Sequence, residues 1–456
     1  MTEEVERFDM ARPPVRTRWF LRPLTYLLSI PDVIAHNVQI HYEGTKDLKP
    51  PFLLLSNHNA FMDFKVLTRA IYPRRANYVV AIDGFIGREW LLRNVGCICK
   101  RKFTSDVTLI RQLLRVVENG DVAVVYPEAR YSLCGTTAVL PESLGKLCKL
   151  LKVPVATFIC HGHHVNSPFW NLHPRGIKPT EVDFKLLFTP SDLESLSADE
   201  INARLVEAYQ YDDFAWLRDK GLQMHYEKRC EGLEKVLYQC PECGTEYEMA
   251  SEGNVLTCNH CGMQWEMAPN GVLHALSGPT RFSHVPDWYE WERRNVRAEV
   301  EAGTYSTGEI PVEVRSLPNS QKFIPLGKGT MVHDMDGFRV CVHDLLGHEH
   351  RMDIPVPAAY SVHIEYNYLG KWGDCVDLNT LTDTWYTYPK VPGCVPPGAA
   401  AVSDAVAGAV SGAVAGAVSD LDWTPRCNVT KMALATEELY FAWRRSIGKP
   451  CKPGLA

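Results

Sequence analysis

From residue 52 to residue 63 the chain reads Phe-Leu-Leu-Leu-Ser-Asn-His-Asn-Ala-Phe-Met-Asp, an apolar strand followed by a histidine and an acid. Each residue of a helix turns about 100°, so His58 and Asp63 would point about 140° apart in one continuous helix. They can meet only if His58 lies in the turn before a helix that carries Asp63 in its first turn. Ser56 and Asn57 are good N-cap residues and supply that junction. The stretch therefore predicts a general base with an orienting carboxylate.

Spacing alone is weak evidence, because His348 and Asp353 have the same separation in a chain with 16 histidines. That second pair has no preceding apolar strand and no Asn-His opening, so we interpret it as an ordinary pair of polar residues in a loop. Three later segments accompany His58 at domain-scale distances. Residues 96–102 end in Lys-Arg-Lys, residues 122–130 form an apolar strand ending in Pro-Glu-Ala-Arg, and residues 153–158 form another apolar strand.

These four blocks, in this order, resemble the glycerolipid acyltransferase family, which includes 1-acylglycerol-3-phosphate O-acyltransferase, over roughly residues 35 to 225. The first block, Asn-His-x4-Asp, matches fully at residues 57–63. In the second block the final basic residue falls on Lys102, with Arg101 beside it. The third block reads Tyr-Pro-Glu-Ala-Arg-Tyr-Ser from Tyr126, so Arg130 stands one place early and the usual glycine is absent.

The resemblance implies acyl transfer to a lipid hydroxyl. His58 would take the hydroxyl proton as the oxygen attacks a thioester carbonyl, and Asp63 would fix the imidazole and stabilise the imidazolium. Arginine and lysine suit an acceptor phosphate, whereas the alternative for each basic residue is a solvated surface charge. Glu128 would order this cationic pocket or contact the acceptor's free hydroxyl. The expected substrate-binding residues are Asn57, Arg101, Lys102, Glu128 and Arg130.

Composition indicates a globular protein of several domains. The chain has 456 residues, a hydrophobic content of 46% and a net charge of -6, which at about 150 residues per domain suggests three domains. No block of like charge favours nucleic-acid binding. The acidic N-terminus has no apolar signal core, so a cytoplasmic location is expected. The 15 cysteines are therefore interpreted as reduced thiols and metal ligands.

No segment convincingly meets the requirement of about 20 apolar residues for a membrane-spanning helix. Residues 19–30 contain Trp19, Phe20, Leu24 and Leu27, with Arg22 among them. This composition predicts an interfacial helix with aromatic and basic anchors, and the alternative is a helix packed on the catalytic core. A lysolipid substrate would imply peripheral contact with the inner face of the membrane.

Two Cys-x2-Cys pairs carry the clearest metal signal. The four cysteines are Cys240, Cys243, Cys258 and Cys261, and fourteen residues separate the pairs. Strands at residues 245–249 and 254–257, joined by a Ser-Glu-Gly-Asn turn, would give the hairpin of a zinc ribbon. Four thiolates favour closed structural zinc; an iron centre or a redox dithiol are the alternatives. The histidine groups at residues 161–164 and 343–350 are interpreted as pocket lining or exposed turns.

Beyond the ribbon the pattern becomes β-rich. A helix is expected at residues 287–302, alternating strands follow from residue 310, and a last helix is expected at residues 430–447. Several strands and one closing helix resemble a pleckstrin-homology-like domain, although any small barrel would look similar. The predicted fold is an α/β acyltransferase domain with a mixed sheet flanked by helices, a small zinc ribbon, and a β-rich C-terminal domain closed by a helix.

The predicted divisions are an N-terminal amphipathic segment at 1–45, the acyltransferase-like domain at 46–230, the zinc ribbon at 236–268, a connecting helix at 280–303, and the β-rich domain at 309–456 with a low-complexity insertion at 392–424. The predicted function is O-acyl transfer from acyl-CoA or acyl-carrier protein to a lysophospholipid. The leading acceptor is 1-acylglycerol-3-phosphate, followed by glycerol 3-phosphate or another lysolipid. The alternative is a degenerate, non-catalytic module that binds lipid and recruits partners.

Overall fold

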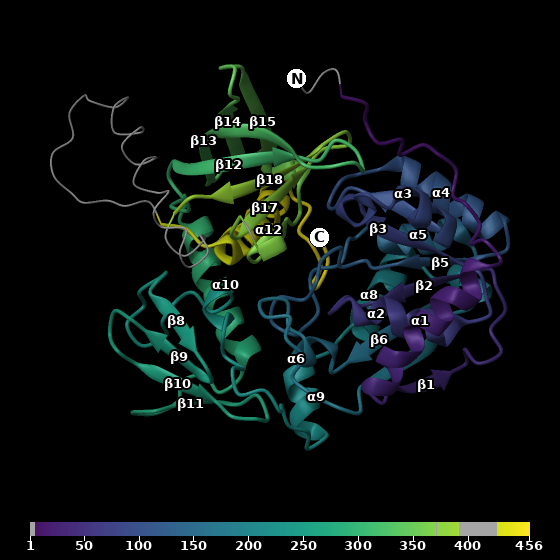
Figure 1. Cartoon of the computed structure of the whole chain (residues 1–456), viewed down its shortest axis with the longest axis horizontal. Coiled ribbons are helices and arrows are strands. Elements are labelled where there is room, and N and C mark those ends of the chain that lie inside the picture. The colour runs from purple at the N-terminus through teal and green to yellow at the C-terminus, as the bar shows by residue number, and fades with distance from the viewer. Residues whose placement is uncertain (1–4, 371, 392–425) are drawn as a thin grey trace.

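The computed structural model describes residues 5–370, 372–391 and 426–456, arranged around three sheets (Figure 1). The insertion predicted at 392–424 lies outside the described residues except at its boundaries. An α/β half occupies one side of the molecule, and a four-stranded and a second seven-stranded sheet lie on the other side (Figure 1). The predicted fold class is confirmed.

The α/β half is built on a seven-stranded sheet in the order β1-β7-β6-β2-β5-β3-β4. All neighbours pair in parallel except β6 and β7, which are antiparallel, so the sheet is mixed. The strands are β1 Gln39–Glu43, β2 Phe52–Ser56, β3 Ala76–Ala81, β4 Cys97–Lys100, β5 Val122–Val125, β6 Val155–His161 and β7 Glu181–Phe188. The central strand β2 is apolar throughout its first four residues because both of its faces are covered.

Helices cover both faces of this sheet. The helices are α1 Leu21–Ala35, α2 Met62–Ile71, η1 Ile82–Phe85, α3 Glu89–Val95, α4 Val107–Glu118, α5 Leu144–Leu151, α6 His163–Asn166, α7 Pro190–Ser195, α8 Ala198–Ala208 and α9 Asp213–Asp219. Phe52 and Leu54 pack with the apolar residues of α2, whereas Leu53 and Leu55 pack with those of α4, α5 and α8. The alternation of side chains along β2 thus divides the core into two layers.

The cysteine-rich segment forms a four-stranded antiparallel sheet after η2 Leu233–Lys235. Its strands are β8 Met249–Glu252, β9 Val255–Cys258, β10 Gln264–Met267 and β11 Leu273–Ala275. The prediction placed the first strand at 245–249, but Ser251 and Glu252 lie inside β8. The reason is that Thr245 closes the first cysteine turn by accepting a hydrogen bond from Cys240 N, so the strand begins only beyond it.

The third sheet is antiparallel and has the order β15-β14-β13-β12-β18-β17-β16. Helix α10 Val285–Glu301 precedes it, and α12 Val429–Ser446 follows it. Its remaining elements are β12 Ile310–Ser316, β13 Ile324–Asp334, β14 Gly337–His343, β15 Glu349–Pro355, η3 Val356–Ala358, β16 His363–Glu365, η4 Tyr368–Gly370, β17 Cys375–Asn379 and β18 Thr384–Pro389. Both helices begin and end within two residues of their predicted bounds.

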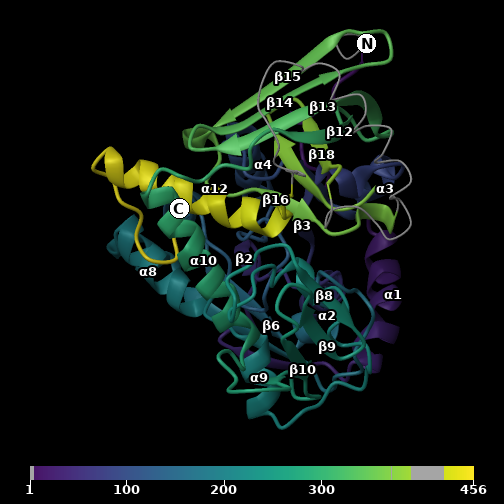
Figure 2. The ribbon, with the colours of Figure 1, turned by 90° about the vertical axis from the view of Figure 1, so that its left-hand side faces the viewer.

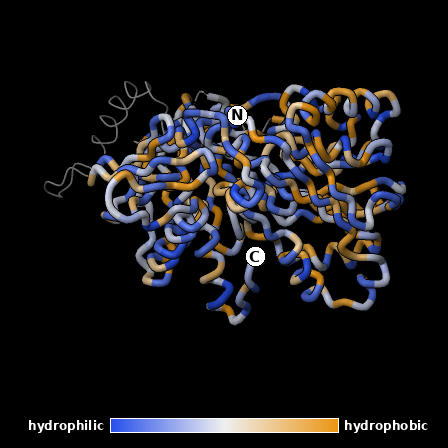
Figure 3. The backbone as a smooth tube through the Cα atoms, turned by 90° about the horizontal axis from the view of Figure 1, so that it is seen from below, coloured by the Kyte–Doolittle hydropathy of each residue, from blue (hydrophilic) through white to orange (hydrophobic). Residues whose placement is uncertain are grey.

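The three sheets share their packing. Helices α10 and α12 lie against each other (Figure 2), and one apolar core extends from Leu133 through the cysteine-rich sheet to Leu439. The last residues return to the α/β half, where Ala456 N donates to Leu140 O over 2.9 Å. Figure 3 shows hydrophobic residues spread through both halves of the molecule. Among the described helices, none combines the length and the hydropathy required to cross a membrane.

Candidate functional site

The junction between β2 and α2 brings His58 and Asp63 together as predicted from their spacing. Helix α2 begins at Met62, so Asp63 lies in its first turn and His58 lies in the preceding turn. His58 Nδ1 is 3.3 Å from Asp63 Oδ2. The same oxygen accepts hydrogen bonds from Asn59 N (2.6 Å) and Ala60 N (3.0 Å). Asp63 therefore shapes the turn as well as facing the imidazole.

His163 is a second partner of Asp63, and the sequence analysis did not identify it. Its Nδ1 lies 2.5 Å from Asp63 Oδ1, and both side chains are fully buried. The loop that carries His163 is held by Asp213 of α9, whose carboxylate accepts hydrogen bonds from Gly162 N and His164 N. The prediction of pocket lining for residues 161–164 missed this contact because the partner lies 100 residues earlier in the chain.

The hydrogen bonds around Asp63 determine its charge. Burial alone would raise the pKa of this carboxyl group, but the hydrogen bonds from His163 and His58 outweigh burial and hold the pKa below its ordinary value. Asp63 is consequently ionised at neutral pH. A buried carboxylate between two imidazole rings can orient His58 and stabilise positive charge on it.

Asn57 and Glu128 hold the loop that carries His58 through hydrogen bonds to the backbone. Asn57 is completely buried, and its side-chain amide both donates to Cys160 O (2.9 Å) and accepts from Cys160 N (2.8 Å), which fixes the end of β2 against β6. Glu128 accepts hydrogen bonds from His58 N (3.0 Å) and Ala138 N (2.7 Å). Burial raises the pKa of Glu128 to about 7. The contacts of these two residues thus hold the loop of His58, and their predicted substrate contacts stay predictions.

The Pro-Glu-Ala-Arg segment adopts a conformation that normally favours glycine. Ala129 has a φ of 55°, in the left-handed region, at the position where the resembled family has glycine. This conformation costs an alanine about 1 kcal/mol or more relative to glycine. The residue that follows this turn, Arg130, pairs with Glu437 of α12.

The predicted cationic pocket is not assembled, because its two arginines are used in contacts with the C-terminal part. Arg101 is 1% exposed, and its guanidinium donates to backbone carbonyls that include Leu317 O (2.9 Å) and to Thr384 Oγ1 (2.7 Å). Arg130 is 4% exposed, and its Nη2 is 2.7 Å from Glu437 Oε1 on α12. Lys102 is half-buried and forms no ion pair with the described residues.

Aromatic rings enclose the imidazole of His58. The rings of Tyr126 and Tyr131 lie 4.4 and 4.3 Å from it, centre to centre. The His58 side chain nevertheless remains 25% exposed, whereas Asp63 is not exposed at all. Among the residues of this pair and His163, therefore, only His58 can meet a molecule arriving from solvent.

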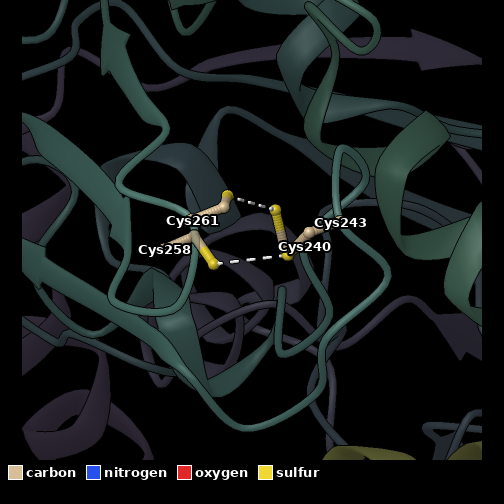
Figure 4. Close-up of side chains that lie close together, drawn as sticks. All are labelled: Cys240, Cys243, Cys258 and Cys261. Carbon is tan, nitrogen blue, oxygen red and sulfur yellow. Dashed lines mark hydrogen bonds between the residues drawn. The ribbon is translucent and has the colours of Figure 1, made fainter.

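The four predicted cysteine ligands converge on one point between two loops (Figure 4). Cys240 Sγ lies 3.7 Å from Cys261 Sγ, and Cys243 Sγ lies 3.8 Å from Cys258 Sγ. All four sulfur atoms lie within 4.8 Å of one another. A tetrahedral zinc ion with Zn–S bonds of about 2.3 Å requires sulfur separations of about 3.8 Å. The cluster could therefore hold a metal ion, and its geometry fits zinc.

The other histidine group, at residues 343–350, lies at the tip of the β14–β15 hairpin. His348 Nδ1 and His350 Nε2 lie 3.1 and 3.3 Å from Asp344 Oδ2. The prediction of an exposed turn agrees with the exposure of the tip, but it overlooked this acid. His348 does not pair with Asp353, so equal sequence spacing does not produce a second copy of the His58 arrangement.

The chain was compared with protein families, curated proteins and solved structures. No curated protein matches the chain. The crystal structure of the 1-acyl-sn-glycerophosphate (LPA) acyltransferase PlsC from Thermotoga maritima is similar at 16% sequence identity, over 42% of this chain and 77% of that chain, with a TM-score of 0.33. The Acyltransferase family model matches residues 37–161, the segment that carries His58, Asp63 and Glu128. The chain therefore contains an Acyltransferase-family domain.

Proposed function

We propose that the chain is an O-acyltransferase that moves an acyl group from a thioester donor, acyl-CoA or acyl-carrier protein, to a lysophospholipid hydroxyl. The observation that carries the proposal is the buried Asp63 carboxylate behind a partly exposed His58, inside a segment that matches the Acyltransferase family. Because Nδ1 of His58 faces Asp63, Nε2 is the nitrogen left for substrate.

His58 acts as general base in this reaction. Nε2 removes the hydroxyl proton while the oxygen attacks the thioester carbonyl, and the collapsing intermediate expels a thiolate that takes the proton back from the imidazolium. Ionised Asp63 stabilises the imidazolium during the step. His163 is a positioning residue, because it holds the far oxygen of Asp63 and is itself buried.

The leading acceptor is 1-acylglycerol-3-phosphate, and Lys102 is the remaining candidate for its phosphate. Arg101 and Arg130 already bind groups of the C-terminal part, so neither contributes a free guanidinium. This difference favours a phosphate contact from fewer side chains than the resembled family pattern implies. The same difference favours the second candidate function, a lipid-binding module without turnover.

We further propose peripheral binding at the inner face of a membrane, with α1 as the main contact. Its segment exposes large apolar side chains, which are Trp19, Phe20, Leu24, Leu27, Leu28 and Ile34. In Figure 2, α1 and α3 lie along the right-hand edge of the molecule. Trp90 of α3 is also exposed. Such a face suits the interfacial region of a bilayer.

The cysteine cluster is proposed to bind structural zinc. Four thiolates close the coordination sphere and leave no position for a substrate. The neighbouring Trp265 and Trp288 rings, 4.9 Å apart, connect this sheet to α10. Zinc would thus stabilise the cysteine-rich sheet, against which α10 packs, and α10 in turn packs against α12.

The test is an assay of the purified full-length protein with labelled acyl-CoA and acyl-carrier protein, and with phosphorylated and unphosphorylated lysolipids as acceptors. His58→Ala should reduce acyl transfer by about 10² to 10⁴. His348→Ala is the matched control, because that exposed histidine has an acid at the same spacing and should retain activity. Lipid binding without turnover in the wild-type protein would reject the enzyme in favour of the binding module.

A further inference from the structure

A second group of ligand-type side chains lies on the C-terminal sheet, where β16 and β17 pair. His363 is directly opposite Asp377 in the antiparallel register, and Glu365 is two residues beyond His363. Because alternate residues of a strand share a face, and directly opposite residues do too, all three side chains lie on one face. His363 Nε2 is 2.9 Å from Glu365 Oε1 and 3.8 Å from Asp377 Oδ2.

The positive charge of Lys102 acts on both carboxylates of this group, but Lys102 does not contact either of them directly. The side chains of Asp377 and Glu365 are 1% and 13% exposed. Neither carboxylate forms an ion pair with a lysine or arginine of the described residues. The hydrogen bond that Asp377 accepts comes from the thiol of Cys375, at 3.6 Å. A buried carboxylate without a cation in direct contact either costs several kcal/mol or takes up a proton. A positive charge at the centre of the group would therefore stabilise the ionised form of both side chains.

The spacing of the ligand atoms suits one cation. Bonds of about 2.0 to 2.2 Å from a metal to nitrogen or carboxylate oxygen place neighbouring ligand atoms about 3 to 3.5 Å apart. The separations of 2.9 and 3.8 Å bracket that range, and the three ligand atoms lie within 4.8 Å of one another. One imidazole and two carboxylates suit borderline or hard divalent ions, in contrast to the thiolate cluster.

The group also lies near the acyl-transfer site. The ring of Phe169 is 6.0 Å from that of His363 and 5.3 Å from that of Tyr131, which in turn contacts His58. Two aromatic side chains thus separate His58 from His363. This is the side of the domain from which Arg101 and Arg130 are directed into contacts with the C-terminal part.

We propose that His363, Glu365 and Asp377 bind a divalent cation beside the acyl-transfer site. The cation neutralises the two buried carboxylates and fixes β16 against β17. If the proposed function is correct, it also supplies positive charge near an acceptor phosphate. The cation site itself does not depend on that function.

The test uses zinc-loaded full-length protein and Mn²⁺ as the probe, with free Mn²⁺ measured by electron paramagnetic resonance. We expect about one Mn²⁺ bound per chain, and a higher unfolding midpoint in its presence because the ion binds the folded state. Glu365→Gln and Asp377→Asn should each weaken binding at least tenfold. Asp344→Asn is the matched control, because Asp344 also faces two histidines but lies on an exposed hairpin, and it should bind like the wild type.

Absence of Mn²⁺ binding in the wild-type protein would overturn the proposal, as would undiminished binding in folded Glu365→Gln. Circular dichroism of each variant identifies any that does not fold, and Glu365→Gln is the variant that decides because its side chain is partly exposed. Acyl transfer is assayed in parallel. Loss of Mn²⁺ binding with retained transfer in Glu365→Gln would support the cation site separately from the enzyme, whereas Mn²⁺ binding by an inactive wild-type protein would reject only the function.

Discussion

Replacing Arg130 by methionine should destabilise the contact between the Acyltransferase-family domain and α12. The Arg130–Glu437 ion pair is buried at both ends, with side-chain exposures of 4% and 0%. Removing one partner of a buried pair typically costs about 3 to 5 kcal/mol. Glu437 keeps Arg293, whose Nη1 lies 2.7 Å from its other oxygen, and the hydroxyl of Ser361 at 2.8 Å. The expected loss is therefore near the lower limit, about 3 kcal/mol.

Glu437→Gln should cost more than Arg130→Met, because it leaves two buried guanidinium groups without their shared carboxylate. Hydrogen exchange of α12 measures the contact locally and avoids assuming that this multidomain chain unfolds in one step. Arg130→Met should increase exchange in α12, and the Michaelis constants of folded variants should change little between phosphorylated and unphosphorylated acceptors. Unchanged exchange together with a raised Michaelis constant only for phosphorylated acceptors would refute the structural role and restore Arg130 as a phosphate ligand.

Three other perturbations test the site and the cysteine cluster. His163→Ala should lower kcat, and it should lower the free energy of unfolding by about 1 to 3 kcal/mol because Asp63 loses a hydrogen bond. His163→Asn should restore part of kcat and part of the free energy of unfolding, as measured in acyl-transfer and unfolding assays. Zinc, about one per chain by elemental analysis, should be lost in the Cys240→Ser, Cys258→Ser double variant; full retention would identify other ligands. Because burial raises the pKa of Glu128 from 4.5 to about 7, its contribution to the free energy of unfolding should fall by up to about 3 kcal/mol between those pH values. Glu128→Gln should remove that part of the pH dependence in unfolding titrations, and an unchanged slope would contradict it.

The features that the sequence predicts best are those whose partners are close in the chain. His58 and Asp63 are separated by one turn, so the strand before them and the start of α2 determine their meeting. The expected capping by Ser56 and Asn57 is not formed, because the N-cap of α2 is Phe61 and the Asn57 side chain binds the backbone of Cys160. The cysteine pairs are similar, because each pair lies in one loop and a single hairpin brings the two loops together. The helices α10 and α12 follow from their periodicity and end signals, which are also local.

The contacts that escaped prediction join distant segments. His163 meets Asp63 across 100 residues, and a run of three histidines within four residues gives no indication of which ring nitrogen finds a carboxylate. Arg101 and Arg130 were expected to bind an acceptor phosphate because of the family resemblance, and the family pattern does not include the C-terminal sheet. Their partners, at residues 317–384 and at Glu437, belong to that additional part of the chain.

The departures from the family pattern therefore have one physical explanation. The first block, which carries the proposed base His58 and its acid Asp63, is intact, as the proposed proton transfer requires. The third block differs where the C-terminal part makes contact: Ala129 keeps the left-handed turn, and Arg130, one place early, reaches the buried carboxylate of Glu437. The buried guanidinium of Arg101 makes a second connection to the same part. Arg101 and Arg130, which the resemblance assigned to an acceptor, thus hold the two halves of the molecule together. If the proposed acyl transfer is correct, recognition of an acceptor phosphate falls to Lys102 and to the proposed cation at His363.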